Sequence, residues 1–398
     1  MVANQPTQDT PLGLQKKQVW TLSGAHLFND LMTTGIVPAL LPLYKEAFHL
    51  SYIGVGFVVL ASYLTSSVMQ PLFGLYTDRH PKAYFLPLGV TLSGVGLSLT
   101  GFAPSLPWLL IFIAFSGLGS GAFHPEASRG AHLASGPVKG MAQAIFQVGG
   151  NMGQALGPLM IPLFLFATGV QGLRYFLIPS ALIGWMTFRL LPWYRRRTQE
   201  ERSKTREISG RNQPLGLTLL VIVVILRSFA QISLSGFLPF YYLHHHLSLN
   251  VAELFTFLFL SAGALATYVG GTLSDRFSKK QLVLASVALA IPFAWLLPRL
   301  SGFVAAVDLF LLGFTILSSF AVTVVYGQML LPRNIGMASG LIIGFGVGAG
   351  GIGATLLGFV ADHFGITFIF DLIVWLPITA TLFAIFLPAD TKKAIPAP

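Results

Sequence analysis

Apolar residues run through this 398-residue chain in long stretches that are separated by short polar connections. A helix needs about 20 apolar residues to cross the roughly 30 Å hydrocarbon core of a bilayer. Twelve stretches approach or exceed this length: near 17–44, 51–76, 84–103, 106–130, 140–168, 172–193, 215–243, 251–273, 281–298, 302–330, 335–361 and 366–388. They predict an all-α membrane protein with twelve transmembrane helices and leave little of the chain for a soluble domain.

Lysine and arginine are unevenly distributed between the two sides of these predicted spans. Of the 24 Lys and Arg residues, all but Lys45, Arg174, Arg227 and Arg299 fall in or beside the same set of alternate connections. Because an excess of positive charge marks the cytoplasmic side, we expect both termini to be cytoplasmic and the chain to be a multi-pass protein of the cell membrane. Membrane topology thus accounts for the net charge of +10. We therefore do not interpret this charge as a nucleic-acid-binding surface and expect no nucleic-acid partner.

Several missing features narrow the functional classes. The chain has no cysteine, which excludes disulfides and thiolate metal sites. It has no Walker A, HExxH or nucleophile-elbow sequence, so nucleotide-driven transport and hydrolysis have no support. The N-terminus MVANQPTQDT lacks the basic start and cleavage site of a signal peptide, so we expect the first span to be retained. We therefore expect no enzyme, no cofactor and no metal site.

The second half of the sequence repeats the first. GLYTDRHPK at 74–82 recurs as GTLSDRFSK at 271–279, and HLS at 49–51 recurs at 246–248, in both cases after 197 residues. The fifth and eleventh stretches match after 196 residues. Parallel repeats of this kind predict two six-helix bundles related by a pseudo-two-fold axis, with a binding site at their interface.

The longest polar run, WYRRRTQEERSKTREISGRNQ, lies at the midpoint of the chain. It predicts the division of the chain into three parts: a first six-helix bundle over 1–192, a basic cytoplasmic linker over 193–214 and a second six-helix bundle over 215–398.

The first span carries His26, Asn29 and Asp30 near mid-membrane. His26 and Asp30 are four residues apart, so they lie one above the other on a helix. An ionisable group at this depth indicates function by default, and we expect Asp30 to carry a coupled proton and His26 and Asn29 to bind substrate. The alternative is a structural His-Asp pair or a carboxylate bonded to a neighbouring helix.

The stretch GAFHPEASRG places His124, Glu126 and Arg129 at the cytoplasmic end of the fourth span. Glu126 and Arg129 are three residues apart and can pair on one helix face, while Pro125 permits a kink. We interpret the stretch as an inner gate in which Arg129 takes part, with a possible proton step at His124 or Glu126. The alternative is a cytoplasmic latch without a proton step.

A stripe of amides follows one face of the fifth span at Gln143, Gln147, Asn151 and Gln154. Amides in contact with lipid are costly, so we expect this face, and Gln147 and Asn151 in particular, to line a polar cavity that binds substrate. Interhelical packing is the alternative. The same span also carries a row of glycines, which predicts close packing with another helix: Gly149, Gly153 and Gly157.

Arg227 lies about twelve residues into the seventh span and matches His26 after 201 residues. A guanidinium stays charged and suits carboxylate, phosphate or phosphonate. We expect Arg227 and Gln231, one turn further along, to bind substrate. The alternative is that Arg227 is a structural counter-ion to Asp30 or Glu126.

The repeated G-x-x-x-D-R sequence lies at cytoplasmic helix ends, where the glycine permits close approach, the aspartate can accept bonds at a helix N-terminus and the arginine can pair with a carboxylate. We expect its six residues to act in gating rather than as ordinary basic loops: Gly74, Asp78, Arg79, Gly271, Asp275 and Arg276.

This motif, present between the second and third and between the eighth and ninth spans, resembles the loop motif of the major facilitator superfamily. HLFNDL, QPLFGLYTDRHP, FHPEASR, IFQVGGNMGQALGP and LLPRNIGMASGL resemble the fosmidomycin-resistance branch. The first motif copy has Pro81 where the family usually has glycine, which leaves the geometry of this loop open.

The resemblance implies export of small anionic or amphiphilic compounds, such as phosphonate antibiotics, in exchange for protons. We therefore predict a secondary transporter that works by alternating access as a monomer, with a small molecule, protons and membrane lipid as its partners. Proton-coupled uptake of a small metabolite is the alternative within transport, and a non-transporting receptor or scaffold is the alternative outside it.

Overall fold

The computed structural model describes residues 13–79, 82–136, 139–165, 168–202, 212–274, 277–332, 337–338 and 340–390. These residues form helices and no strand, as the apolar stretches predict. The lipid core offers no water to the backbone, so each spanning segment must satisfy its own polar groups, and a helix does so along its whole length.

The first half of the chain contains, in order, α1 (Lys16–Asp30), the π-helical turn η1 (Leu31–Gly35), α2 (Ile36–Ala39), α3 (Leu41–Ala47), α4 (Tyr52–Arg79), α5 (Phe85–Thr100), α6 (Leu106–Ala134), α7 (Lys139–Leu156), the π-helical turn η2 (Ile161–Leu165), the 3₁₀ helix η3 (Val170–Phe176) and α9 (Leu177–Phe188). α10 (Leu191–Arg202) follows it.

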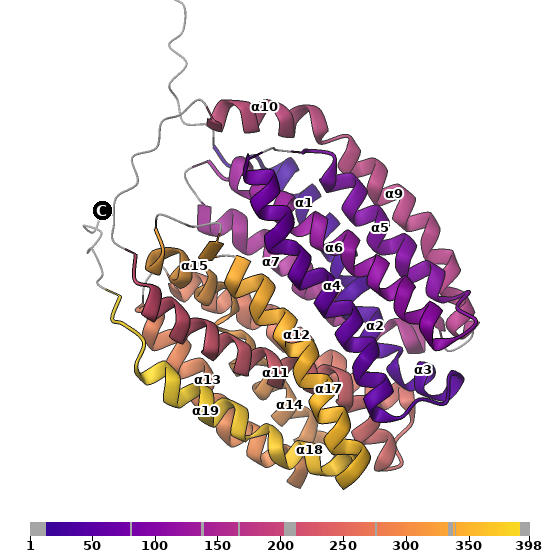
Figure 1. The fold of residues 1–398 in the computed structure, drawn as a ribbon. Coiled ribbons are helices and arrows are strands. Elements are labelled where there is room, and N and C mark those ends of the chain that lie inside the picture. Colours follow the sequence, from indigo (N-terminus) through magenta and orange to yellow (C-terminus); the bar gives the residue numbers. More distant parts are fainter. Residues whose placement is uncertain are drawn as a thin grey trace, which may run out of the picture.

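The second half contains α11 (Pro214–His244), α12 (Leu249–Ser274), α13 (Lys279–Leu296), the 3₁₀ turn η4 (Leu297–Arg299), α14 (Gly302–Leu317), α15 (Phe320–Leu330), the π-helical turn η5 (Gly340–Phe345), α17 (Gly346–Phe364), α18 (Ile366–Ile373) and α19 (Trp375–Ile385). Figure 1 shows the indigo-to-magenta helices of the first half beside the coral-to-yellow helices of the second. The halves meet where α4 packs against α17 and α7 packs against α12.

Each predicted apolar stretch is helical, although not every one is a single straight helix. Within the described residues, eight segments are long and apolar enough to cross a membrane, and a ninth is the pair formed by η3–α9 and α10, which bends by 41°. α5 has only 16 residues. The first and fifth stretches are interrupted by the π-helical turns η1 and η2. The prediction of an all-helical fold of twelve spans is confirmed.

The internal repeat is visible in the backbone itself. His49 and His246 are the two non-glycine residues in the described part of the chain with positive φ, at 51° and 61°, and they occupy the first position of the repeated HLS. Gly169 and Gly365 also have positive φ, 59° and 87°, and are 196 residues apart. Because positive φ is rare outside glycine, its recurrence at the repeat distance shows that equivalent positions adopt equivalent conformations.

The linker begins as a helix. α10 starts at Leu191, and Tyr194 on it is fully buried against Ala83, Leu133 and Leu191. In Figure 1 α10 lies across the end of the first-half helices. Residues 203–211 of the predicted linker lie outside the described residues. The first part of the 193–214 segment is therefore docked on the first bundle.

The small residues of α7 pack against α1, as the sequence predicts. A Cβ at Gly153 would overlap the carbonyl group of Leu27, and one at Gly157 would overlap the backbone of Gly35. Gly149 meets the carbonyl of Ser23 in the same way. The glycines therefore allow the two helix backbones to approach each other more closely than any side chain would permit.

We predict that Gly153→Ala lowers the melting temperature of the detergent-purified protein, because overpacking costs about 1–3 kcal/mol. Gly24→Ala is the matched control, since a Cβ at Gly24 meets no atom within 4 Å. It should melt at or slightly above the parent temperature, because alanine has the higher helix propensity. Equal melting temperatures for the two variants would contradict the close packing of α1 and α7.

Candidate functional site

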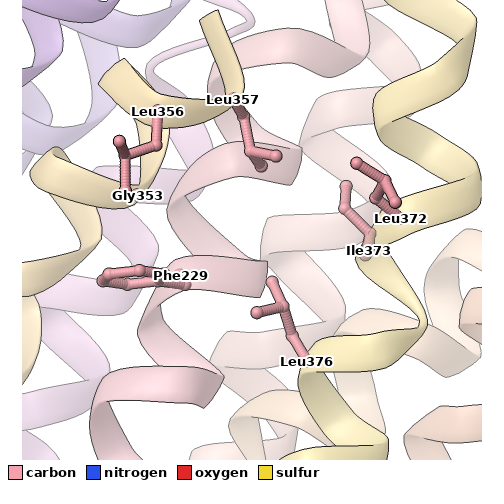
Figure 2. Close-up of a pocket in the computed structure, with 7 residues that line it drawn as sticks. All are labelled: Phe229, Gly353, Leu356, Leu357, Leu372, Ile373 and Leu376. Carbon is pink, nitrogen blue, oxygen red and sulfur yellow. The ribbon is translucent and has the colours of Figure 1, made fainter. Parts of the chain in front are cut away.

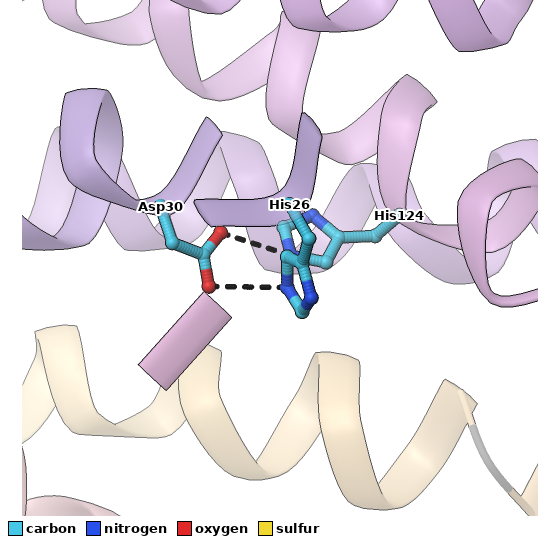
Figure 3. A group of neighbouring side chains, drawn as sticks. All are labelled: His26, Asp30 and His124. Carbon is cyan, nitrogen blue, oxygen red and sulfur yellow. Dashed lines mark hydrogen bonds and ion pairs between the residues drawn. The ribbon is translucent and has the colours of Figure 1, made fainter. Parts of the chain in front are cut away.

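The first half holds a cluster of three ionisable side chains from α1 and α6, hereafter the His-Asp-His cluster: His26, Asp30 and His124. His26 Nε2 lies 3.2 Å from Asp30 Oδ2, and His124 Nε2 lies 3.2 Å from Asp30 Oδ1. The two Nε2 atoms are also 3.2 Å apart. Figure 3 shows the carboxylate of Asp30 directed at both imidazole rings. The contact of His26 with Asp30 matches the pair that the sequence analysis gave as the alternative, and His124 joins it from another helix.

The hydrogen bonds on the far side of each ring determine what faces Asp30. His26 Nδ1 lies 2.8 Å from the carbonyl oxygen of Phe146, and His124 Nδ1 lies 2.9 Å from the carbonyl oxygen of Ser120. A carbonyl oxygen can only accept, so both Nδ1 atoms carry hydrogen. Each neutral ring therefore presents a lone pair at Nε2. With Asp30 ionised, the atoms of the three residues that face one another, both Nε2 atoms and the carboxylate, are all acceptors, and a cation bound among them would hold them together.

Asn29 and Gly150 complete the surroundings of the cluster. Asn29 is fully buried, donates to Asp30 Oδ1 at 2.9 Å and to Ser120 Oγ at 3.0 Å, and accepts from Ser93 Oγ at 2.7 Å. These bonds use its amide to hold Asp30 rather than to meet a substrate. A Cβ at Gly150 on α7 would overlap the His26 ring and the carboxylate of Asp30, so the α7 backbone lies directly against the cluster.

A proton and a metal ion both match the chemistry of the cluster. One ligand atom from each residue lies within 4.8 Å of the others. The 3.2 Å separations are close to the edge of a tetrahedron around an ion about 2.0 Å from each corner. A proton needs no further ligand, whereas zinc in catalytic sites takes a fourth ligand such as water.

Glu126 belongs to a different cluster from His124, which corrects the interpretation of GAFHPEASRG as one gate. Glu126 is fully buried, pairs with Arg129 Nη1 at 3.1 Å and accepts a hydrogen bond from the Tyr194 hydroxyl. Arg129 Nη1 also donates to the carbonyl of Thr77 at 3.1 Å. Positions 124 and 126 lie about 200° apart around a helix, so their side chains point to opposite sides of α6, which continues through Pro125.

The latch around Glu126 lies within the first half. It ties α6 to the end of α4 and to α10, and Arg129 closes it through the pairing that the three-residue spacing predicts. Of the two interpretations of this stretch, this geometry matches the cytoplasmic latch at Glu126 and Arg129, while His124 lies with Asp30.

The amide stripe of α7 faces the second half. Asn151 Nδ2 donates to Thr267 Oγ1 on α12 at 2.8 Å, and Gln154 Oε1 accepts from Gln231 on α11 at 3.4 Å. Gln143 instead donates to Ser128 within the first half at 3.3 Å, and Gln147 is buried. Asn151 and Gln154 are thus satisfied by packing between the halves in this conformation.

Arg227 is a buried cation without an ion-pair partner in the described residues. It is 3% exposed, its Nη1 lies 3.5 Å from Ser319 Oγ, and its guanidinium stacks 5.1 Å above the ring of Phe320. Its Nε has no hydrogen-bond partner there. The alternative in which Arg227 is the counter-ion of Asp30 or Glu126 is wrong for this conformation. Arg227 matches His26 across the repeat, and Phe320 matches His124 after 196 residues.

Only part of the predicted gating motif is described. Gly74 faces Pro125 at 3.9 Å and Gly271 faces Ala321 at 3.8 Å, measured from the position that a Cβ would take. Pro125 and Ala321 are themselves 196 residues apart, so the two motif glycines have equivalent surroundings. The side chains of Asp78 and Arg79, and all of Asp275 and Arg276, lie outside the described residues.

Sequence reasoning missed three buried or bridging carboxyl groups. Asp362 near the end of α17 accepts hydrogen bonds from the backbone N–H groups of Tyr52 and Ile53, each at 2.8 Å, and so caps α4 from the other half. Glu253 on α12 and Asp308 on α14 are buried. A carboxyl group within an apolar stretch is a signal that could have identified Glu253 and Asp308. The contact of Asp362 had no local signal.

A separate apolar pocket of about 180 Å³ lies in the second half, between α11, α17 and the α18–α19 segment. Figure 2 shows its lining, which consists of Phe229, Gly353, Leu356, Leu357, Leu372, Ile373 and Leu376. It contains none of the predicted site residues and suits an apolar group such as a lipid chain.

Known proteins resemble the chain over nearly its whole length. A fosmidomycin resistance protein from Escherichia coli is 35% identical, with 94% of this chain and 93% of that protein aligned. An uncharacterized MFS-type transporter, YfnC, from Bacillus subtilis is 38% identical, with 92% and 91% aligned.

Two solved structures share the fold. A bacterial homolog of the human lysosomal transporter Spinster, inward-facing and occupied, superposes with a TM-score of 0.73 at 16% identity and covers 97% of both chains. The xylose transporter XylE from E. coli gives a TM-score of 0.70 at 15% identity, covering 93% of this chain and 98% of that one.

The sequence profile of the Major Facilitator Superfamily matches residues 22–343. Together with the two repeated six-helix halves and the relatives that align along nearly the full length, this match shows that the chain belongs to the major facilitator superfamily of membrane transporters and is not an enzyme.

Proposed function

We propose that the protein is a proton-coupled exporter of a small anionic or amphiphilic compound, such as a phosphonate antibiotic. The single observation that carries the proposal is the His-Asp-His cluster, whose inward-facing atoms are lone pairs that require a cation. A proton that binds there is shared among Asp30, His26 and His124, and its release leaves three acceptors in repulsion. The cluster is therefore a site whose packing depends on proton occupancy.

The substrate class follows from the second half. Arg227 is a permanent cation that is buried and has no ion-pair partner among the described residues, and such a charge is stabilised by an anion with planar oxygen atoms. Gln231, which lies one turn away, reaches the first half through Gln154. We place the anionic group of the substrate between Arg227 and the His-Asp-His cluster. The name of the E. coli relative, a fosmidomycin resistance protein, supports an antibiotic as the exported compound.

Alternating access requires contacts between the halves that can open. The bonds from Asn151 to Thr267, from Gln231 to Gln154 and from α4 to Asp362 join the halves in this conformation. Each consists of one or two hydrogen bonds, which can be exchanged for bonds to water or substrate at modest cost. We propose that these bonds break in turn as the halves rock.

The bias of basic residues supports an orientation in the plasma membrane with both termini in the cytoplasm. We propose in addition that the protein works as a monomer. Uptake of a small metabolite remains the second candidate, because the direction of flux depends on gradients and on the order of binding. A non-transporting scaffold would have little use for a buried cluster that needs a cation.

We predict that Asp30→Asn abolishes transport driven by a pH gradient while substrate binding remains measurable. The asparagine keeps the shape of the side chain but removes the charge that makes a proton necessary. Phosphonate flux in reconstituted vesicles measures the transport, and a pH-sensitive dye in the same vesicles measures the accompanying movement of protons. Asp371→Asn, which changes a half-exposed carboxyl group on α18, should behave like the parent. Full gradient-driven flux in Asp30→Asn would refute the assignment.

The same vesicles distinguish a proton from a metal ion in the cluster. A chelator on both sides of the membrane should leave the parent flux unchanged if the coupled ion is a proton. Loss of flux with the chelator, restored by zinc, would show instead that the His-Asp-His cluster works as a metal site.

We predict that Arg227 selects the charge of the substrate. Arg227→Gln should weaken binding of an anionic ligand by about 10- to 100-fold, because a charge-assisted hydrogen bond contributes about 1.5–3 kcal/mol, and should spare a neutral analogue. Arg227→Lys keeps the charge but not the planar fork and should lie between the two. Dissociation constants for the matched ligand pair measure the effect. An equal loss for both ligands would mean that Arg227 supports only the fold.

We predict that Asp362→Asn opens the contact between α4 and α17. Removing the charge from the N-terminus of α4 weakens a cap worth about 1–2 kcal/mol, which shifts the closed-to-open ratio by about 5- to 30-fold. Because the chain has no cysteine, maleimide labelling of Thr355→Cys, which lies at this contact, reports the opening. Asp371→Asn is again the matched control. Equal labelling rates with and without Asp362 would exclude it as a latch.

A further inference from the structure

Glu253 is a carboxyl group without a hydrogen-bond partner in the part of the chain that the structure describes. It lies on α12, one turn from the first residue, Leu249, and its side chain is fully buried. Neither carboxylate oxygen has a hydrogen-bond partner among the described residues. Asp30 and Glu126, by contrast, each bond to two or more groups. Glu253 is therefore in the least favourable setting of the three for a charge.

The face of α12 that carries Glu253 is turned toward the first half. Thr267, which bonds to Asn151 on α7, lies 14 residues further along, close to four full turns, so the two residues share a face. α12 also packs against η2, which follows α7. Glu253 thus lies at the contact between the halves, near the end of the bundle opposite α10.

The repeat supports the same placement independently. The equivalent of Glu253 in the first half is Gly56, after 197 residues, and Gly56 packs tightly against Thr355 on α17, which donates to its carbonyl at 3.1 Å. This contact between α4 and α17 corresponds to the contact between α12 and α7. The equivalent position in these two contacts is therefore Gly56 in one and Glu253 in the other.

Among the described residues, Glu253 has no cationic partner. η2 has no ionisable residue, and α7 has only Lys139, at its opposite end. In the second half, the titratable side chains at this end of the helices packed against α12 include Asp308 on α14 and Tyr242 and His244 on α11; His244 is exposed, and none of the three bonds to Glu253. An ionised carboxylate buried in this way is costly. Metal ions require several ligands, whereas a proton requires one oxygen.

We propose that Glu253 is a second proton-binding site, which must be occupied before the two halves can close at this end of the bundle. The inference rests on the proposed function in one respect, namely that the halves open and close there. In the open state Glu253 meets water and ionises; in the closed state it is neutral. Closure at this end therefore takes up a proton at a site distinct from the His-Asp-His cluster.

The sign of the pH dependence follows directly. Opening releases one proton, so the ratio of open to closed protein rises with pH, by up to about tenfold per pH unit. Low pH should hold this end closed, and high pH should open it.

Labelling of Thr355→Cys in detergent-purified, substrate-free protein tests this, because Thr355 contacts Gly56 of α4 in this conformation and loses that contact when the end opens. The labelling rate at each pH is divided by the rate for the unfolded protein, which removes the effect of pH on the reaction of maleimide with cysteine. The corrected rate should rise from about pH 5 to pH 9. Glu253→Gln should label slowly throughout, since it imitates the protonated side chain. Glu253→Met, which fills a similar volume without a polar group, should behave in the same way and covers the case in which the glutamine variant fails to fold.

Asp308→Asn is the matched control, because it removes the other buried carboxyl group of this end and should keep the pH response. Asp30→Asn should keep it too, which separates this site from the coupling site, since no substrate or gradient is present. A pH response that persists in both Glu253 variants would overturn the proposal, as would a parent protein whose labelling does not change with pH. Failure of the proposed function would appear in the vesicle flux alone.

Discussion

The dry interior of the bilayer is the constraint on which this structure depends, because an ionisable side chain there must find its partner within the protein. The chain meets the constraint in different ways. Asp30 lies between two imidazoles, and Glu126 is held by Arg129 and Tyr194. Arg227 stacks on an aromatic ring, and Glu253 has no hydrogen-bond partner among the residues that the structure describes. The fewer partners a group has, the more its state depends on a proton or a ligand.

Duplication supplied one backbone for two different kinds of chemistry. The positions of His26, Asp30 and His124 correspond to Arg227, Gln231 and Phe320 in the second half. In the proposed function, an exchangeable proton in the first half thus has as its counterpart in the second half a fixed charge, an uncharged amide and an aromatic ring. In the proposed mechanism, the first half changes its charge during the cycle and the second half does not. A substrate between them therefore faces a charge that varies on one side and a charge that is constant on the other.

Much of this arrangement could be predicted from the sequence because its causes are local. The spans follow from apolar length, and the pairs of His26 with Asp30 and of Glu126 with Arg129 follow from helical spacing. Contacts between distant helices could not be predicted in this way: neither the approach of His124 to Asp30 nor the cap that Asp362 places on α4 has a signature in spacing. The separation of His124 from Glu126 was predictable from helix geometry, since two residues turn a side chain to the opposite face.

α7 connects the His-Asp-His cluster to the interface between the halves through two consecutive residues. Gly150 lies against the His26 ring and the Asp30 carboxylate, and Asn151 bonds to Thr267 on α12. The glycine has no side chain to absorb a displacement, so a change in the spacing of the cluster acts on the α7 backbone directly. The adjacent residue holds the other half by a single hydrogen bond. In the proposed function, the proton site therefore lies against the same short segment of α7 that carries one of the hydrogen bonds between the halves.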